Sequence, residues 1–498
     1  MVEDCSIDIK LDHYIDLVDK NIFGHFIEHL GRCIYPGVWV GINSKVSDGN
    51  GFRRDTVDAL KSIFAPVIRW PGGCFADYYH WSDGVGPRES RPRRLNVWWK
   101  GEESNEFGTD EFIQFCKVVG AEPYICVNVG SGSPEEALAW LEYCNLSGNT
   151  KYANMRASNG HIEPYNVKFW GVGNESWGCG GNFDPVYYAW EYRRFSTFLK
   201  RADPSIKLIA CGHITRDWNF RFMEAMRDHI HLIDYLSIHY YFRNGQRYGD
   251  DVNFSDEQYF NLLYDIQHLE YLIQQAIYAI DFFSEGRKDI GLIVDEWGVW
   301  HPQATVETGL YQQNTLRDAI LAASVLNLFT RYSNKIKMAN IAQAQSVCLT
   351  EGNKTILTPT YHVFNMYKSH MNNYALKVEC ESPTVWSGEK ESIVQRKLKP
   401  LKALDASASI SQDKKILVLT VVNQSLDKDY SAKISNNRGV KFLEATLVTL
   451  NANNVRSYND FESKDNVKTV EETFTVNSSS IEFTFKKHSV NRLTIKLE

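Results

Sequence analysis

The chain has 498 residues, more than the roughly 250 to 300 that one hydrophobic core usually serves, so we expect one large domain and at least one smaller one. Hydrophobic residues make up 43% of the chain and charged residues 23%, values typical of globular proteins that argue against disorder. The formal net charge of -7 argues against nonspecific binding to nucleic acid or anionic lipid, so we expect neither nucleic acid nor a membrane as a partner.

The chain begins with MVEDCSIDIK, which contains acidic residues and no apolar segment of signal-peptide length. No apolar run in the sequence is long enough to cross a bilayer. We therefore expect a cytoplasmic protein. The ten cysteines are scattered, and several, such as Cys126 and Cys211, lie in apolar runs, which predicts buried free thiols.

Eight short apolar runs predict β-strands that are buried on both faces. Segments with helical periodicity separate them, most clearly at 255–280, where Ser255 and Gln258 form a capping box and a stripe of isoleucine and leucine continues to Ile280. Strands and helices that alternate in this way predict an α/β fold, a (β/α)8 TIM barrel with insertions. The predicted strands cover residues 22–29, 66–73, 122–130, 167–175, 206–212, 234–241, 291–297 and 337–345.

The sequence pattern changes after about residue 375, where β-branched residues alternate or cluster and turn residues recur at short intervals. This pattern predicts a C-terminal β-sandwich with a jelly-roll-like layout. The opening of the chain also resembles a strand, and we expect it to join that sheet. The predicted domains are therefore an N-terminal strand segment at 1–20, the barrel at 21–375 and the β-sandwich at 376–498.

Carboxylic acids follow two of the predicted barrel strands. Glu175 ends the run VKFWGVGNE, and Glu296 lies at the end of GLIVDEW. Because the reactive groups of a TIM barrel gather at the C-terminal ends of its strands, we expect both glutamates to face one opening. A protonated carboxyl group opposite an ionised one can cleave an acetal, and different surroundings must hold the two in those states.

Either glutamate alone has a simpler interpretation. A glutamate after a strand is usually the neighbour of a helix cap, a loop residue or half of a structural ion pair. Two such glutamates, three strands apart in one barrel, favour catalysis. Their spacing does not fix their roles, but Asn174 beside Glu175 can hold a sugar hydroxyl, so we assign Glu175 as the acid and Glu296 as the nucleophile.

Other strand ends carry the polar and aromatic side chains that a sugar needs. Arg69, His239 and Tyr241 are the candidates, although His239 could be a buried core histidine and Arg69 could neutralise a buried glutamate. The PGG sequence at 71–73 could be only a tight turn. The indoles expected near this rim are Trp98, Trp99, Trp177 and Trp297.

We expect no cofactor and no metal. His25, Glu28 and His29 do not follow the HExxH pattern, and alternation along a strand would point His25 and Glu28 to opposite faces. The chain has no GxxxxGK[ST] loop, and no GxGxxG stretch opens a βαβ unit. Cys74 has no Cys–His spacing that supports a nucleophile, so we expect a thiol that lines the pocket.

Seven motifs together resemble the α-L-arabinofuranosidases of glycoside hydrolase family 51. The resemblance runs from about residue 20 to 375, and the β region after it is similar in layout. The motifs are FGHFIEHLGRCIYPGVWVG, IRWPGGCFADYYHW, FGTDEFIQFC, EPYNVKFWGVGNESWGCGGN, IHYY, VDEWGVW and MANIAQAQSV.

This resemblance implies a retaining, exo-acting hydrolase that releases terminal non-reducing α-L-arabinofuranosyl residues from arabinose-containing oligosaccharides or polysaccharides. Glu175 matches the acid/base of the family and Glu296 its nucleophile. Family members are often cytosolic homo-oligomers, commonly hexamers, which implies the same here. The pocket for one furanose ring maps onto Glu28, Cys74, Asn174, Tyr241 and Gln345, with Trp98, Trp99 and Trp297 as walls and with Arg69 and His239 in support.

Three points stay open at this stage. The run between the two glutamines is shorter than in the family, so either Gln343 or Gln345 could line the pocket. The chain could also be another retaining glycosidase on the same barrel, such as a β-xylosidase or an endoglucanase, or an inactive carbohydrate-binding protein. The sequence does not distinguish arabinan from arabinoxylan or a short oligosaccharide. A structure tests the retaining class first, because retention requires carboxyl groups about 5 to 5.5 Å apart.

Overall fold

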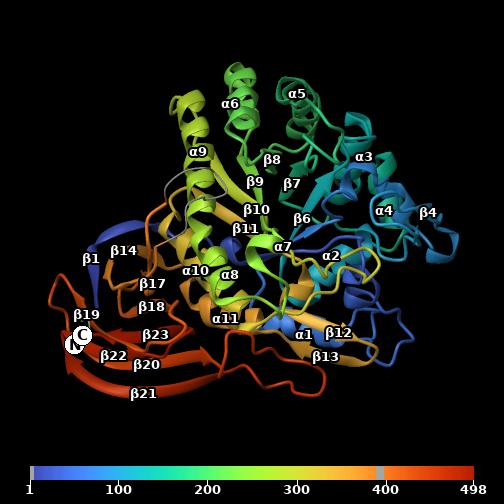
Figure 1. The fold of residues 1–498 in the computed structure, drawn as a ribbon. Coiled ribbons are helices and arrows are strands. Elements are labelled where there is room, and N and C mark those ends of the chain that lie inside the picture. The colour runs from blue at the N-terminus through green and yellow to red at the C-terminus, as the bar shows by residue number, and fades with distance from the viewer. Residues whose placement is uncertain (1–4, 388–397) are drawn as a thin grey trace.

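The computed structural model describes residues 5–387 and 398–498 of the chain. A closed barrel of eight strands and a sheet-rich domain lie side by side in this described part (Figure 1). Neighbouring barrel strands all run parallel, in the order β10-β11-β2-β3-β6-β7-β8-β9. The strands are β2 (Gly24–Phe26), β3 (Val67–Trp70), β6 (Glu122–Val127), β7 (Phe169–Val172), β8 (Lys207–Ala210), β9 (Tyr235–Phe242), β10 (Gly291–Val299) and β11 (Ile336–Ala342).

All eight predicted barrel strands are confirmed, but most of them are shorter than predicted. Strand β2 keeps three residues of the predicted 22–29, so Glu28 lies beyond its end. Strand β7 ends at Val172, and Gly173 follows with a φ of 82°, a left-handed conformation that side chains disfavour. Asn174 and Glu175 therefore lie in the loop after the strand rather than in the strand itself.

Helices cover the outside of the barrel (Figure 1). The capping box of Ser255 and Gln258 is confirmed, but the helix predicted at 255–280 forms as two, α8 (Asp256–Tyr264) and α9 (Ile266–Ser284), which meet at Asp265. No helix in the described part of the chain is both long and apolar enough to span a membrane. The other α-helices are α1 (Arg54–Ser62), α2 (Thr109–Val119), α3 (Pro134–Asn145), α4 (Lys151–Ser158), α5 (Pro185–Ala202), α6 (Arg216–Ala225), α7 (Gly245–Tyr248), α10 (Leu316–Arg331) and α11 (Pro359–Tyr367).

A layer of side chains fills the barrel near the beginning of its strands. Each member lies within the first three residues of a different strand and is almost completely buried. This layer closes the barrel from below, as in other TIM barrels, so an active site has room only at the C-terminal ends of the strands. Its members are Val67, Tyr124, Phe169, Ile209, Ile293 and Met338.

In the described residues, the main sheet of the sheet-rich domain has nine strands in the order β21-β20-β23-β18-β17-β14-β1-β19-β22. The N-terminal strand β1 (Cys5–Leu17) lies inside this sheet, because it pairs with both β14 and β19. Phe442 of β20 and Phe485 of β22 come from opposite ends of the strand order and share one hydrophobic core, so the sheet folds over on itself as a sandwich. The remaining strands are β14 (Tyr374–Glu381), β17 (Leu404–Ile410), β18 (Ile416–Asn423), β19 (Tyr430–Asn436), β20 (Phe442–Asn451), β21 (Lys468–Ser478), β22 (Ser480–Phe485) and β23 (Ser489–Leu497).

Helix α10 joins the barrel to the sandwich. Asn327 accepts hydrogen bonds from Tyr367 of α11, at 2.9 Å, and from Ser407 and Thr420 of the sandwich, at 2.9 and 2.8 Å. These groups are buried, so each hydrogen bond replaces one that water would otherwise make. The polar network fixes how the two domains dock.

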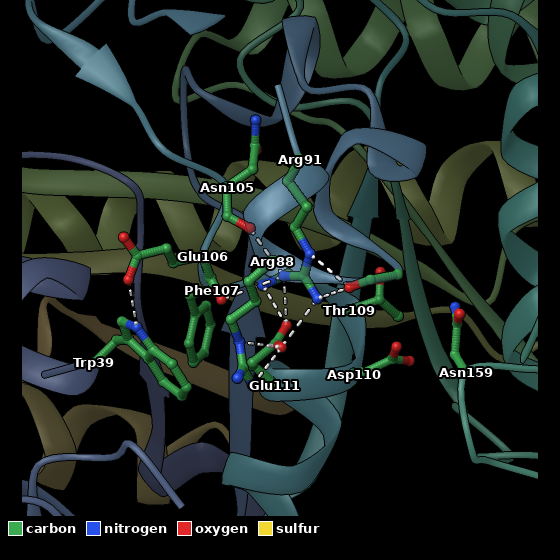
Figure 2. Close-up of polar contacts among 12 residues, drawn as sticks. Trp39, Arg88, Arg91, Asn105, Glu106, Phe107, Thr109, Asp110, Glu111 and Asn159 are labelled. Atoms are coloured by element: carbon green, nitrogen blue, oxygen red, sulfur yellow. Dashed lines mark hydrogen bonds and ion pairs between the residues drawn. The ribbon is translucent and has the colours of Figure 1, made fainter. Parts of the chain in front are cut away.

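An ion-pair cluster fixes the long connection between β3 and α2, residues 71–108 (Figure 2). Glu111 in the first turn of α2 accepts from Arg88 Nε at 3.0 Å and from Arg91 Nη1 at 3.0 Å. Arg91 also donates to the backbone oxygen of Asn105 at 2.9 Å. The side chains of Glu111 and Arg91 are only 5% and 3% exposed, so the cluster holds the connection against the barrel.

Replacing Glu111 by Ala should therefore lower the free energy of unfolding by about 3 kcal/mol, because it leaves two guanidinium groups without their carboxylate. Urea denaturation followed by tryptophan fluorescence measures the change. Glu102→Ala is the matched control, since the pair of Glu102 with Arg93 is largely exposed and should contribute little. Equal losses in the two variants would contradict a structural role for the buried cluster.

Candidate active site

Arg69 of β3 is fully buried and connects two side chains of β10 with one from the loop after β7. Its Nη1 donates to Glu296 Oε1 at 2.6 Å, and its Nη2 donates to Asn174 Oδ1 at 2.6 Å. Its Nε lies 3.4 Å from Asp295 Oδ2. One cation therefore ties β10 to the loop that follows β7.

A register shift in β10 aims two successive acidic residues into the barrel. Val294 pairs with Ile238 of β9, and Glu296 pairs with His239, so Asp295 is an extra residue on β10. Such bulges often re-aim side chains beside active sites. Because of this bulge, Asp295 and Glu296 both contact Arg69, whereas in a regular strand they would face opposite sides.

Glu296 is surrounded by donors. Tyr241 Oη donates to Glu296 Oε2 at 2.7 Å, Arg69 donates to Oε1, and His239 Nδ1 lies 3.6 Å from Oε1. Burial opposes ionisation, but the charges of His239 and Arg69 and these hydrogen bonds outweigh it and hold the pKa of Glu296 below its ordinary value. Burial, followed by the charge of Glu296, raises the pKa of Tyr241, so its hydroxyl remains a donor.

Glu175 contacts the same nitrogen of the His239 imidazole as Glu296 does. His239 Nδ1 is 3.0 Å from Glu175 Oε1, and single atoms of Glu175, His239 and Glu296 all lie within 4.8 Å of one another. Burial lowers the pKa of His239, but the charges of Glu296 and Glu175 reverse that effect and raise it. The Glu175 side chain is 20% exposed and the Glu296 side chain 5%, so only Glu175 is accessible to solvent to a useful degree.

Asp77 connects three loops beneath Glu175. Its carboxylate accepts from the backbone nitrogens of Asn174 at 2.7 Å, Val129 at 2.8 Å and Gly130 at 3.1 Å. Burial raises its pKa to about 7 even though these hydrogen bonds favour the ionised form. The loop that carries Asn174 and Glu175 is therefore held to the loops after β3 and β6.

Glu28 forms a second buried acidic position beside the pair. Its Oε1 accepts from Trp99 Nε1 and from the backbone nitrogen of Phe75, both at 2.9 Å. Burial and, after it, the charge of Glu296 raise the pKa of Glu28 to about 8. Gly72 is more than part of a turn, because a Cβ there would lie 2.5 Å from Glu28 Cγ.

A small cavity of about 40 Å³ adjoins Tyr241. Both Gln343 and Gln345 line it, and the side-chain oxygens of both are buried without a hydrogen-bond partner. Buried polar atoms are rarely left unpaired, so these acceptors are suited to the hydroxyl groups of a ligand. Both glutamines thus line this cavity, and the choice of the one that contacts a sugar stays a prediction; the other lining residues include Leu30, Val299, Trp300, Gln312 and Asn314.

Known proteins resemble this chain along nearly its whole length. Residues 56–259 match the family described as Alpha-L-arabinofuranosidase 1 domain, and residues 295–489 match the Alpha-L-arabinofuranosidase C-terminal domain. The chain is 38% identical to the intracellular exo-alpha-L-arabinofuranosidase of Bacteroides ovatus, over 99% of this chain and 93% of that protein.

Two solved structures have the same fold. One is the family 51 arabinofuranosidase of Xanthomonas axonopodis pv. citri, with a TM-score of 0.92, 34% identity and coverage of 99% of this chain and 100% of that one. The other is the arabinose complex of the Thermotoga maritima alpha-L-arabinofuranosidase, with a TM-score of 0.88, 36% identity and the same coverage. The chain belongs to the α-L-arabinofuranosidases of glycoside hydrolase family 51.

In this family 51 member, most of the residues predicted for the site lie together. Arg69, Asn174, Tyr241, His239 and the two glutamates are linked by direct contacts. Glu28 and Trp99 form a hydrogen-bonded pair that interacts electrostatically with Glu296. The two glutamines line the adjoining cavity.

The prediction for Trp297 was wrong, and that for Trp98 stays a prediction. Trp297 is only 1% exposed and packs against Phe329 and Phe364, because it follows Glu296 on β10 and faces the helices outside the barrel. Trp98 is 42% exposed and does not line the cavity beside Tyr241. The cavity wall is instead Trp300, whose ring stacks on Trp99 with centroids 6.2 Å apart.

The prediction of a free thiol at Cys74 was also wrong. Cys74 forms a disulfide with Cys179, whose Cα lies 5.5 Å away. The prediction of free thiols is confirmed for the other eight cysteines, seven of which are buried. The two bonded residues are 105 positions apart, and their sequence spacing gives no sign of the pairing.

Sequence reasoning missed several residues that shape the site. The sequence shows Asp295 directly before Glu296 in VDEW, but it does not reveal the β-bulge that turns Asp295 into the barrel. Asp77 lies in FADYY, away from any strand end, and its role depends on backbone groups from two other loops. Tyr124 of β6 donates to Asp295 of β10 at 2.8 Å from four strands away in the barrel order, a contact across the barrel that only its closure creates.

Replacing Glu28 by Gln should remove a pH dependence from stability. The folded pKa of about 8 lies above the ordinary 4.5, so between these values the folded protein keeps a proton that the unfolded chain releases. The contribution of Glu28 to stability therefore decreases as the pH rises from about 5 to 8. The stability of Glu28→Gln relative to wild type should increase over this range.

Urea denaturation at pH 5, 6, 7 and 8 measures this difference. Glu163→Gln is the control, because Glu163 is exposed and should give a difference that does not change with pH. A flat difference for Glu28→Gln would show that the Glu28 carboxyl group titrates normally.

Proposed function

We propose that the protein is a retaining, exo-acting α-L-arabinofuranosidase, which releases terminal non-reducing α-L-arabinofuranosyl residues from arabinose-containing oligosaccharides or polysaccharides. The observation that carries this proposal is the separation of Glu175 and Glu296, which have carboxylate oxygens within 4.8 Å of each other. Retaining enzymes hold their carboxyl groups about 5 to 5.5 Å apart, and inverting ones about 6.5 to 9.5 Å. Membership of family 51 supports arabinofuranose as the sugar.

In the first step, Glu296 attacks the anomeric carbon while Glu175 donates its proton to the departing glycosidic oxygen. The C–O bond to the leaving group breaks, the bond to Glu296 forms, and an alcohol leaves. The lowered pKa of Glu296 supports its role as the ionised nucleophile. Its donors, Arg69 and Tyr241, also hold the attacking carboxylate in one orientation.

In the second step, water attacks the anomeric carbon and Glu175 accepts its proton. The ester bond breaks, and Glu296 leaves as a carboxylate. The ester carries no charge, so a second carboxylate beside it is no longer opposed by a like charge. The partial exposure of Glu175 supports this role, because its carboxyl group must reach first the leaving group and then water.

We propose that five residues bind the furanose ring: Glu28, Asn174, Tyr241, Gln343 and Gln345. The unpaired oxygens of the two glutamines support this assignment, as does the location of Tyr241 between Glu296 and the cavity. Trp99 and Trp300 are suited to the apolar face of the sugar or of its leaving group, since aromatic faces pack against C–H groups. Arg69 and His239 position the two carboxyl groups.

Three finer points belong to the same proposal. The name of the Bacteroides ovatus relative, an intracellular exo-enzyme, supports a cytoplasmic location and exo action. Arabinan and arabinoxylan are the polymers whose side chains offer the required residues. Self-association, as a hexamer by resemblance to the family, is supported by aromatic side chains exposed on the outer helices α5 and α9, namely Tyr187, Trp190, Phe198, Tyr278 and Phe282.

Glu175→Ala should lose far more activity on substrates with poor leaving groups than on activated aryl arabinofuranosides, because only poor leaving groups need a proton. Azide should restore turnover and give an arabinofuranosyl azide. Glu296→Ala should lose nearly all activity on both substrates, since no ester can form. Steady-state kinetics on the two substrate classes measures these effects, and equal losses on both for Glu175→Ala would contradict its role as the acid.

Aryl α-L-arabinofuranosides should be cleaved at least 100-fold more efficiently than aryl β-D-xylopyranosides, because membership of family 51 supports arabinofuranose as the sugar. The ratio of the two kcat/KM values measures this preference. A ratio below one would favour a β-xylosidase, and release of internal oligosaccharides from a linear polymer would favour an endo-acting enzyme. No turnover of any glycoside would favour an inactive carbohydrate-binding protein.

A further inference from the structure

The Cys74–Cys179 disulfide lies directly against Glu175. Cys179 Sγ is 3.5 Å from Glu175 Oε2, and Cys74 Sγ is 4.0 Å from the same oxygen. A disulfide sulfur carries no hydrogen, so these are contacts without a hydrogen bond. All three residues are partly exposed, and the bond connects the loop after β3 to the loop after β7.

The state of the other cysteines and the proposed location of the protein indicate that this disulfide has more than a structural role. The eight other cysteines are free thiols, and we propose a cytoplasmic location for the protein. In the cytosol, glutathione and thioredoxin-type proteins keep most thiols reduced, and the disulfides that do occur are commonly redox-sensing or catalytic. Partial exposure of Cys74 and Cys179 gives a reductant access to them.

Reduction of this bond has a simple balance. A dithiol supplies two electrons and two protons, its own two thiols become a disulfide, and the Cys74–Cys179 bond is replaced by two S–H groups. The products are two thiols that both face one carboxylate. Two sulfur ligands beside an oxygen ligand form a donor set that Zn²⁺ and Cd²⁺ prefer.

The distances fit a tetrahedral ion. Zinc bonds of about 2.3 Å to sulfur and about 2.0 Å to oxygen place a sulfur and an oxygen ligand about 3.5 Å apart. The two sulfur-to-Glu175 distances are 3.5 and 4.0 Å. The two sulfurs must separate from their bonded distance, and rotation of the two side chains supplies this because the Cα atoms are 5.5 Å apart.

We propose that reduction of the Cys74–Cys179 disulfide creates a binding site for a thiophilic divalent cation such as Zn²⁺, formed by the two thiolates and Glu175, and that its occupancy stops hydrolysis. Binding displaces the two thiol protons and takes the Glu175 carboxylate as a ligand. Glu175 then cannot deliver a proton to the leaving group. The inhibition rests on the proposed role of Glu175 as acid/base, whereas the binding site does not.

Another trio, Glu175, His239 and Glu296, also places its donor atoms within 4.8 Å of one another. Arg69 donates to Glu296 at 2.6 Å, and its positive charge opposes a second cation there. A site at that trio would also need no reduction. Dependence on the redox state therefore separates the two positions.

Cobalt is a suitable probe, because Co²⁺ bound to thiolates absorbs by charge transfer. The full chain is compared before and after treatment with a dithiol that is then removed without air. Denatured samples should contain eight free thiols before reduction and ten after it. Only the reduced enzyme should bind one Co²⁺ per chain with thiolate absorption, and one equivalent of Zn²⁺ should lower its activity at least tenfold, reversibly with a chelator.

Two variants make the test specific. Reduced Cys179→Ser should bind the metal at least tenfold more weakly than the reduced wild type. Cys380→Ser, which removes a partly exposed thiol from β14 in the sandwich, should bind as the wild type does. Ten thiols before reduction would overturn the redox dependence, and equal binding by the oxidised enzyme or full binding by Cys179→Ser would overturn the site.

If the reduced enzyme binds the metal ion but hydrolysis continues at the same rate, only the proposed inhibition is overturned. That result would contradict the role of Glu175 as acid/base rather than the existence of the site. The leaving-group dependence of Glu175→Ala then decides independently whether the proposed function fails.

Discussion

The contact between Arg69 and Glu296 is the interaction on which the site depends. Both side chains are almost completely buried, and Arg69 Nη1 donates to the carboxylate at 2.6 Å. Loss of either partner would leave a buried charge without compensation, which typically costs about 3 to 5 kcal/mol. Because Arg69 also holds Asn174, the same cation fixes Glu296, which we propose as the nucleophile, and the loop that carries Glu175, which we propose as the acid. The geometry of the proposed site therefore relies on one guanidinium group.

The two glutamates differ because their surroundings differ. Glu296 receives hydrogen bonds from Arg69 and Tyr241 and is screened from water, which lowers its pKa despite burial. Glu175 contacts His239 and two sulfur atoms and is partly exposed. His239 lies between the two carboxyl groups, and its raised pKa reflects their combined negative charge. Such a division lets one carboxyl group stay ionised while the other exchanges protons.

The sequence predicts the architecture better than it predicts the walls of the site. Short apolar runs identify all eight barrel strands, because strands buried on both faces need continuous apolar sequence. Glu175 and Glu296 could be identified as site candidates because each comes at the end of one of those apolar runs. The β-bulge at Asp295 depends on how β10 pairs with its neighbour and not on the local sequence pattern. This bulge leaves Trp297 facing outward, and Trp300 lines the cavity instead. Likewise, the Cys74–Cys179 bond and the three hydrogen bonds to Asp77 join loops that are distant in sequence. Contacts of that kind arise only when the barrel closes.

The central claim is that Glu296 forms a covalent bond to the sugar from one face while Glu175 works from the other. Methanolysis tests it most directly, because methanol replaces water in the second step and its product keeps a fixed anomeric configuration. Hydrolysis of an aryl α-L-arabinofuranoside in dilute methanol, followed by proton NMR at early times, should give methyl α-L-arabinofuranoside after two inversions. Methyl β-L-arabinofuranoside as the first product would mean a single displacement and would contradict the account.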